Sequence, residues 1–272
     1  MARRRVTCDS PRVASPPESP GSYDDVVARL RAAGCVYAEE EADLLLEEGG
    51  DLGALVARRV AGEPLEWVLG WAEFGDLRVV VRPGVFVPRR RTELLAAEAI
   101  VRLRPAAVAV ELCCGAAAIA AVILEEVPFV EVHAADIDPV AVACARENLP
   151  NGNVHEGDLF DPLPVDLRGR IDVLVANTPY VPSDEVALMP AEARDHEPRA
   201  TLDGGPDGLA LLRRISAEAR DWLGPGGHVL IEVSELQLPV ALSVFEADGL
   251  AATSASDDDL AATVVIGRVP DA

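Results

Sequence analysis

The sequence contains no lysine, so its 24 basic residues are all arginine, and they face 46 aspartates and glutamates. We attribute the missing lysine to genome composition, because alanine, glycine, proline and valine are abundant as well. The shortage of cations does bear on function, since duplex nucleic acids are bound by clustered cations that neutralise phosphates. With a formal net charge of −22, we expect no direct binding of duplex nucleic acid. Such acidity favours solubility or steering towards a basic protein partner.

Two further features are missing. No apolar run is long enough to span a membrane, and the basic start at residues 1–5 is not followed by the apolar segment of a signal peptide. The cysteines form no C-x-x-C pair and have no histidine at metal-ligand spacing, so we predict no metal site. An odd, scattered set of thiols is typical of reduced cysteines, which predicts a cytoplasmic protein. The five are Cys8, Cys35, Cys113, Cys114 and Cys144.

The first 91 residues divide into three parts. Residues 1–21 are rich in proline, serine and arginine and are predicted to be a disordered leader. Residues 22–70 show apolar positions at helical spacing, broken by glycines, and predict a small helical domain for substrate recognition. Residues 71–91 predict a β-hairpin linker, with strands at 77–81 and 85–87 around a turn at Pro83-Gly84.

From residue 92 to residue 272, short apolar runs alternate with helical stretches. This alternation is typical of an α/β fold with a doubly wound, parallel sheet. In such sheets the ligand lies at the carboxyl ends of the strands. The predicted strands are 108–112, 130–135, 154–156, 171–176, 229–233, 250–253 and 262–266, and the predicted helices are 92–103, 117–126, 138–149 and 206–223.

Three successive strand ends carry acids that suit a nucleoside. The first strand leads through Glu111 into the small-residue turn Cys113–Ala117 and a helix, whose free N–H groups can approach a ligand closely. The next strand ends in Asp136, which is placed to accept both ribose hydroxyls. Asp158 follows, and its carboxylate can accept from an adenine amino group. Each feature alone is also common as a structural turn or a helix cap, but their order favours a nucleoside site.

The strand at 171–176 ends in Asn177-Thr178-Pro179-Tyr180. Residue 178 precedes a proline and is held extended, so its carbonyl and the Asn177 carboxamide can act as two acceptors aimed at one point. An –NH2 group needs an acceptor for each hydrogen, and Tyr180 adds a flat wall. The alternative is an asparagine-initiated turn stiffened by prolines.

Over residues 23–240 the chain resembles the HemK-like protein-(glutamine N(5)) methyltransferases, which modify release factors or a ribosomal protein. Asn-Thr-Pro-Tyr stands where the family usually has Asn-Pro-Pro-Tyr, as in an actinobacterial-type paralogous branch. The motifs are Arg58-Arg-x-x-Gly62-Glu-Pro-Leu65, Gly70-x-x-Glu-Phe74, Val85-Phe-Val-Pro-Arg89-x-x-Thr92-Glu93, Glu197-Pro-Arg199, Leu202-Asp-Gly-Gly205, Asp207-Gly-Leu209, Gly226-Gly227 and Glu232.

The resemblance implies a Rossmann-like class I methyltransferase domain with an antiparallel last strand, using S-adenosyl-L-methionine as its cofactor. It implies a protein substrate that presents a glutamine, and catalysis at Asn177, Thr178, Pro179 and Tyr180. Substrate contacts are implied for Arg89, Thr92, Glu93, Asn177 and Tyr180. Cofactor contacts are implied for Glu111, Cys113, Cys114, Gly115, Ala116, Ala117, Asp136, Asp158, Leu159 and Asn177.

The chain departs from the family pattern in the turn, where Asp-Leu-Gly-x-Gly-x-Gly is replaced by Glu-Leu-Cys113-Cys-Gly115-Ala-Ala117. If either replaced glycine requires a positive φ, the added β-carbon costs roughly 1–2 kcal/mol and weakens cofactor binding about tenfold. Three other readings stay open: a methyltransferase for exocyclic amino groups of nucleic-acid bases, an N-methyltransferase for a small molecule or peptide natural product, and a silent binding protein with little cofactor affinity. His196 is interpreted as structural or as a substrate contact.

Overall fold

The computed structural model describes residues 22–270, and the leader predicted for residues 1–21 lies outside them. The chain divides into two compact units after Gly62. In the first unit, helices α1 (Tyr23–Ala32), α2 (Ala38–Glu48) and α3 (Leu52–Val60) enclose a small apolar core. A buried ion pair joins Arg59 of α3 to Glu41 of α2 at 2.6 Å.

The helical domain was predicted to run to residue 70, but α4 (Leu65–Leu69) belongs to the second unit. Its Trp67 is buried in the core of that unit, and the indole N–H donates to the Val85 carbonyl at 2.9 Å. The boundary after Gly62 therefore follows packing that the helical periodicity of the sequence does not reveal.

The hairpin lies within residues 71–91, and its predicted strand at 77–81 is observed, but the predicted strand at 85–87 was wrong. Strand β1 (Trp71–Phe74) pairs with β2 (Leu77–Val80) around a turn at Gly75, whose φ is +57°. Side chains take the backbone groups that a second strand at 85–87 would have used. Asn148 binds both the N–H and the carbonyl of Val80 at 2.8 Å, and Trp67 occupies the carbonyl of Val85.

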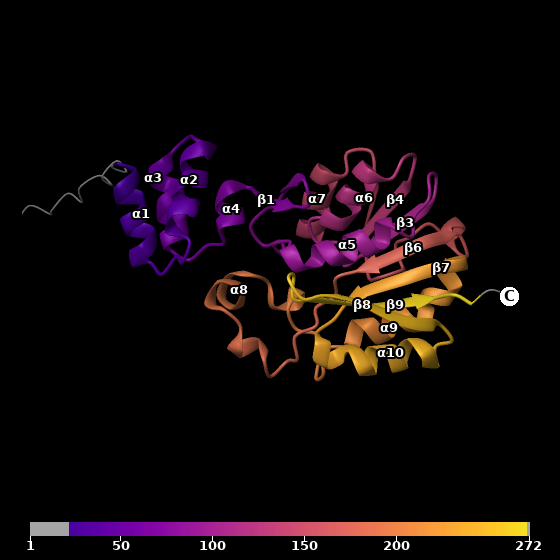
Figure 1. Ribbon diagram of the computed structural model, residues 1–272. Helices are drawn as coiled ribbons and strands as arrows, with labels where there is room; N and C mark the ends of the chain where they lie inside the picture. Colours follow the sequence, from indigo (N-terminus) through magenta and orange to yellow (C-terminus); the bar gives the residue numbers. More distant parts are fainter. Residues whose placement is uncertain (1–21, 271–272) are drawn as a thin grey trace, which may run out of the picture. The chain divides into compact units, whose positions relative to one another are not determined.

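The second unit is built on a seven-stranded sheet in the order β5-β4-β3-β6-β7-β9-β8. Figure 1 shows β4, β3, β6 and β7 following one another across this sheet. Only β9 runs against its neighbours; the other pairings along the sheet to β7 are parallel. The α/β class with an antiparallel last strand is confirmed. The strands are β3 (Val108–Leu112), β4 (Glu131–Asp136), β5 (Asn153–Glu156), β6 (Ile171–Ala176), β7 (Leu223–Glu232), β8 (Ala251–Asp257) and β9 (Ala262–Arg268).

Helices cover both faces of this sheet and enclose two apolar cores. Strand residues alternate between the cores: Ala109 faces one and Val110 the other, as period-two side chains require. On one face lie α5 (Glu93–Ile100), α6 (Ala118–Glu126) and α7 (Pro139–Asn148), and on the other lie α9 (Ala210–Trp222) and α10 (Leu238–Ala247) (Figure 1). A short helix, α8 (Ala191–His196), interrupts the long connection between β6 and α9. Among the described residues, no helix is long and apolar enough to cross a membrane.

Strand β3 pairs with β4 on one side and with β6 on the other. The chain moves outwards through β4 and β5 and then returns to the other side of β3, so the strand order reverses there. Ligands of doubly wound sheets bind at the carboxyl ends of the strands at this switch point.

Candidate active site

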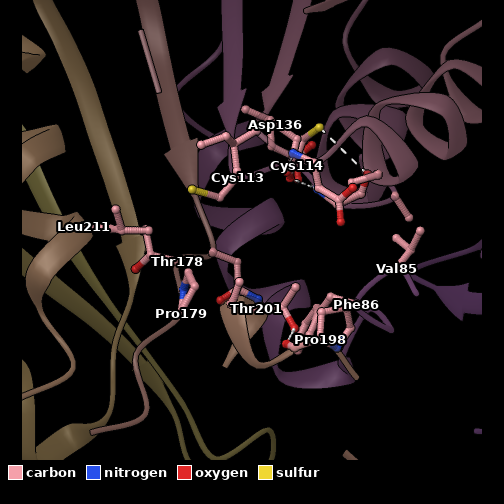
Figure 2. A pocket seen from close by; sticks show the side chains of 18 of the residues that line it. Val85, Phe86, Cys113, Cys114, Asp136, Thr178, Pro179, Pro198, Thr201 and Leu211 are labelled. Atoms are coloured by element: carbon pink, nitrogen blue, oxygen red, sulfur yellow. Dashed lines mark hydrogen bonds between the residues drawn. The ribbon is translucent and has the colours of Figure 1, made fainter. Parts of the chain in front are cut away.

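A pocket opens at the carboxyl ends of β3, β4 and β6, with a cavity volume of about 280 Å³. Its walls come from the three strand ends, from the segment between the hairpin and α5, and from the connection that follows β6. Figure 2 shows Cys113, Cys114 and Asp136 in the upper part of the pocket, Phe86 and Pro198 at the lower right, and Thr178 and Pro179 on the left towards Leu211. The pocket thus unites the predicted nucleoside and acceptor residues.

The turn after β3 is held in the left-handed region by residues that are not all glycine. Cys113 has a φ of +53°, Gly115 of +53° and Ala117 of +58°. The Cys114 N–H donates to Ala135 on β4 at 3.1 Å, which ties the turn to the neighbouring strand. A β-carbon at Gly115 would meet nothing within 4 Å, since this glycine faces the open pocket. The strain expected at Cys113 and Ala117 is therefore present, at roughly 1–2 kcal/mol each.

The two thiols of this turn are free. Burial raises the pKa of Cys113 to about 12 and that of Cys114 well above its ordinary value. A thiol is nucleophilic only as a thiolate, so both cysteines act here as small packing residues.

Asp136 ends β4 and binds the turn from the side. Its Oδ2 accepts from the Gly115 N–H at 2.8 Å, and its Oδ1 accepts from the Asp138 N–H at 2.9 Å. Burial raises the pKa of the carboxyl group, and these two backbone hydrogen bonds lower it. Each oxygen has a second lone pair, so both can still accept from a ligand hydroxyl.

Glu111 lies beneath the same turn and is 4% exposed. Its Oε2 accepts from the Ala120 N–H at 2.7 Å, which satisfies one of the free donors at the start of α6. Burial is the main reason that its pKa rises to about 8, and the nearby charge of Asp136 adds to the rise. The carboxyl group is therefore largely protonated at neutral pH.

Asp158 and Leu159 line the pocket beyond β5. Leu159 is buried with a φ of +49°, and Asp158 is half-exposed. The Asp158 carboxylate forms an ion pair with Arg214 of α9 at 2.8 Å. An adenine amino group would share Asp158 with this arginine, a partner that the sequence did not suggest.

On the opposite side of the pocket, the Asn177 carboxamide has a defined neighbour. Its Nδ2 donates to the Thr92 hydroxyl at 3.1 Å, which leaves Oδ1 as the acceptor. Thr178 follows and is 3% exposed, although it lines the pocket. Thr92, predicted as a substrate contact, is also buried, and it holds Asn177 in place.

Tyr180 is anchored through both its hydroxyl and its carbonyl. The hydroxyl donates to Glu232 Oε1 at 3.3 Å, and burial is the first cause of the raised pKa of the phenol. Its carbonyl accepts from Gln237 Nε2 at 2.8 Å. The Arg91 guanidinium lies 5.5 Å from the ring centroid and also pairs with Glu232 Oε1 at 3.3 Å.

Sequence reasoning did not assign Glu232, Gln237 or Arg91 to the site. Glu232 was visible only as one of the family motifs, and Gln237 belongs to the short helix after β7. Nearby, Gly208 packs against the Tyr180 carbonyl, where an added β-carbon would lie only 2.1 Å from the oxygen. In the sequence, the glycine at position 208 was the local signal for this close backbone approach.

Of the remaining predicted substrate residues, one lines the pocket and one does not. Arg89 lines the pocket, and its guanidinium pairs with the buried Glu197 at 2.6 Å and lies over the Phe86 ring. Glu93 does not line the pocket; its carboxylate accepts from the Gly75 N–H at 3.3 Å, in the hairpin turn. His196 ends α8 and also lies outside the lining.

These features fit S-adenosylmethionine. The open space above Gly115, the helix start beneath the turn and the two acceptor oxygens of Asp136 suit the amino acid and ribose parts of a nucleoside cofactor. Asn177 lines the wall next to this space, where an acceptor group can approach. No group of three or more histidine, cysteine or acidic side chains suited to a metal occurs among residues 22–270.

Known proteins are similar to this chain in sequence. A family model for the methyltransferase small domain matches residues 76–195. The release factor glutamine methyltransferase of Geobacter sulfurreducens is 35% identical over 239 residues, which cover 86% of this chain and 83% of that protein. Its counterpart in Streptomyces coelicolor is 41% identical over 189 residues, 67% of each chain. The 4-amino-L-phenylalanine/4-methylamino-L-phenylalanine methyltransferase of Streptomyces pristinaespiralis is 30% identical over 87% of this chain and 90% of that protein.

Solved structures agree at the level of the fold. A methyltransferase from Pyrococcus furiosus superposes with a TM-score of 0.55 at 19% identity, over 72% of this chain and 91% of that one. The ribosomal protein L11 methylase from Lactobacillus delbrueckii subsp. bulgaricus gives 0.51 at 17% identity, over 76% and 93%.

Proposed function

Since this chain belongs to the family of release factor glutamine methyltransferases, we propose that it transfers a methyl group from S-adenosylmethionine to the side-chain amide nitrogen of a protein glutamine. The observation that carries the proposal is the orientation of Asn177. Its Nδ2 donates to Thr92, so the oxygen is left to accept. A primary amide presents two N–H donors and needs acceptors of this kind.

We place the cofactor against the turn Cys113–Ala117, with its ribose on Asp136 and its base near Asp158 and Leu159. Glu111 supports the turn from beneath through α6, and Asn177 lies where the cofactor and the acceptor meet. When bound, S-adenosylmethionine supplies an electrophilic methyl group on its sulfonium.

The residues Asn177–Tyr180, which form the acceptor wall of the pocket, act by positioning the substrate amide. An amide nitrogen is a poor nucleophile, because its lone pair is delocalised into the carbonyl. Asn177 Oδ1 and the Thr178 carbonyl would hold the two N–H groups so that the nitrogen faces the methyl group, and Tyr180 would keep the amide flat. The same two acceptors stabilise the positive charge that develops on nitrogen during transfer. No base needs to act before transfer; as the S–CH3 bond breaks, the cofactor leaves as a neutral thioether, and the methylated nitrogen then releases one proton to water.

Other parts of the chain fit a protein substrate. Arg89 lines the pocket and is partly exposed, so it can contact the acceptor. Helices α1 to α3 form a separate acidic unit that we assign to recognition of the protein substrate. We place the enzyme in the cytoplasm, where the thiols of Cys113, Cys114 and Cys144 would stay reduced.

The test is labelled methyl transfer to bacterial release factors. The chain is incubated with methyl-labelled S-adenosylmethionine and a purified release factor, and the modified residue is located by mass spectrometry of peptides. We expect one methylated glutamine, and no label when that glutamine is replaced by alanine. Label on another residue type would contradict the assignment.

A second acceptor belongs in the same assay. The relative from Streptomyces pristinaespiralis spans 87% of this chain and is named for a free amino acid carrying an amino group on its ring. 4-Amino-L-phenylalanine should therefore be tested at equal concentration, with duplex DNA as a third acceptor. Methylation of the free amino acid alone would replace the glutamine proposal with a small-molecule one.

A further inference from the structure

The hydrogen bond from Asn177 Nδ2 to the Thr92 hydroxyl lasts only while that hydroxyl acts as the acceptor. The two ends of an asparagine amide are nearly the same shape, and a threonine hydroxyl can donate as well as accept. With Asn177 turned over, Thr92 could donate to Oδ1, and Nδ2 would point at the substrate. A donor would then face a donor. Another group must therefore accept the hydrogen bond from the Thr92 hydroxyl, so that Thr92 cannot donate to Asn177.

Glu232 is placed to do this. Its side chain is 2% exposed at the end of β7, and its Oε1 receives the Tyr180 hydroxyl and the Arg91 guanidinium. Its Oε2 is buried and has no hydrogen-bond partner among the described residues. An unsatisfied buried carboxylate oxygen is costly, so it requires a donor.

The Thr92 hydroxyl lies beside this carboxylate and is the free donor at hand. Burial raises the pKa of Glu232, while the Thr92 hydroxyl, the charge of Arg91 and the Tyr180 hydroxyl lower it. The net shift is upwards, but the ion pair with Arg91 at 3.3 Å holds Glu232 as a carboxylate, and a carboxylate can only accept. Thr92 must then donate towards Glu232, and only its lone pairs remain for Asn177.

We propose that Glu232 and Thr92 are positioning residues that fix the polarity of Asn177, so that its oxygen faces the acceptor. This inference rests on the proposed amide-methylating function. Glu232 accepts from the Thr92 hydroxyl, the Thr92 oxygen accepts from Asn177 Nδ2, and Asn177 Oδ1 is left to face the acceptor. Through its second oxygen the same carboxylate holds Tyr180, so one buried charge organises both the acceptor and the flat wall of the site.

The first experiment needs no acceptor substrate. The chain has four asparagines, at 148, 151, 153 and 177, so ¹⁵N-asparagine labelling gives four side-chain amide signals, and Asn177→Ala identifies the one sought. In the wild type we expect an Asn177 amide proton that exchanges slowly with solvent, because Nδ2 is bonded in a buried site. Thr92→Val keeps the shape and removes the hydroxyl, and should shift this signal and speed its exchange at least tenfold.

Three variants complete the set. Thr92→Ser restores the hydroxyl and should return the wild-type signal. Glu232→Gln offers an NH2 group to Thr92, so that Thr92 accepts from residue 232 and its hydroxyl is free to donate to Asn177. The Asn177 signal should then shift and exchange faster, as in Thr92→Val. Thr253→Val is the matched control: Thr253 lies on β8, where it pairs with Ile266, and lines neither this pocket nor the hollow beside Glu232. It should leave the Asn177 signal unchanged. Melting curves establish that each variant is folded.

Kinetics give the second measurement. If a glutamine acceptor is methylated, Thr92→Val should lower kcat at least tenfold, with cofactor affinity unchanged within twofold, whereas Thr92→Ser should recover most of the rate. An Asn177 signal in Thr92→Val identical to that of the wild type would overturn the inference, as would an unchanged kcat. If no glutamine is methylated by the wild type, the proposed function fails, and the amide signals still decide whether the polarity is set as proposed.

Discussion

The two walls of the pocket are built in different ways. The wall formed by Cys113–Ala117 presents backbone, and its shape depends on three left-handed residues, of which only one is glycine. The wall formed by Asn177–Tyr180 presents side chains held from behind by Thr92, Glu232 and Gln237. The first wall stores strain, whereas the second contains a buried charge.

This difference teaches where sequence change is tolerated. A backbone wall keeps its N–H groups whatever the side chains are, so cysteine and alanine can replace glycines at a cost in strain. A wall of side chains loses its geometry when one residue loses a donor or an acceptor, because the hydrogen-bonding groups of its neighbours are then left without partners in a buried site. Changes in the turn should therefore appear in cofactor affinity, and changes in the acceptor wall in turnover.

The largest effect is expected for Asn177→Ala. It removes the acceptor oxygen and leaves the substrate amide misaligned, so methyl transfer should fall at least about a hundredfold, the scale on which misplaced reacting groups lower rates. Cofactor affinity, measured by calorimetry, should change less than about threefold. Asn153→Ala, which removes an amide bonded to the Val132 carbonyl away from the pocket, is the control. Near-normal turnover in Asn177→Ala would exclude amide methylation at this site.

Asp136→Ala should weaken cofactor binding at least about tenfold, since charge-assisted hydrogen bonds contribute roughly 1.5–3 kcal/mol. The variant also removes the acceptor for the Gly115 N–H, so the turn itself loosens. Asp172→Ala provides the comparison, because its carboxylate binds the Val108 N–H at the far end of the sheet. It should lower the melting temperature without changing affinity. Equal affinities of Asp136→Ala and the wild type would show that the ribose lies elsewhere.

Replacing both Cys113 and Ala117 by glycine tests the strain in the backbone wall. Relief of roughly 1–2 kcal/mol at each position is offset by about 0.5–1 kcal/mol of glycine entropy. Cofactor affinity should therefore stay the same or tighten up to about tenfold. Ala106→Gly relieves the same strain at a φ of +64° outside the pocket and should leave affinity unchanged. A clear loss of affinity in the double variant would mean that the turn depends on these side chains.

Glu111 predicts a dependence of stability on pH. Its pKa is near 4.5 in an unfolded chain and about 8 in the fold, so the folded protein keeps a proton that the unfolded chain releases. The contribution is full below pH 4.5 and is lost as the pH rises towards 8. In Glu111→Gln, the melting temperature of the cofactor-free protein should fall less between pH 5 and pH 8 than in the wild type. Parallel curves would show that Glu111 is ionised in the fold.

The sheet was predictable because it rests on periodicity. Each predicted strand overlaps an observed one, since apolar runs such as Ile171–Ala176 are buried on both sides of the sheet and have no other stable place. One strand of the hairpin was misplaced, at 85–87, because Trp67 and Asn148 bind the backbone groups that it would have used. Local patterns contain no information about such partners.

Pocket residues were predictable where they directly follow a strand, and not where they come from distant parts of the sequence. The turn at Cys113–Ala117 and the loop at Asn177–Tyr180 follow their strands directly, and both line the pocket. Thr92 and Glu232 lie 85 and 55 residues from Asn177 in the numbering of the chain, so only folding brings them together. Glu93 shows the reverse error: adjacency to Thr92 in a motif placed it in the site, but the helix turns its carboxylate towards Gly75.

The smallest effect is expected for Thr178→Pro, which restores the usual family residue and bears directly on the comparison of the two walls. Residue 178 precedes Pro179, which favours an extended backbone, and among the described residues no backbone hydrogen bond uses its N–H, so a proline ring removes nothing that the site needs. Its carbonyl, the second acceptor, survives. We expect turnover within about threefold of the wild type, because only the 3%-exposed side chain changes. Steady-state transfer to the glutamine acceptor measures this. A loss as large as that of Asn177→Ala would show that the threonine side chain, and not the carbonyl of residue 178, contacts the substrate.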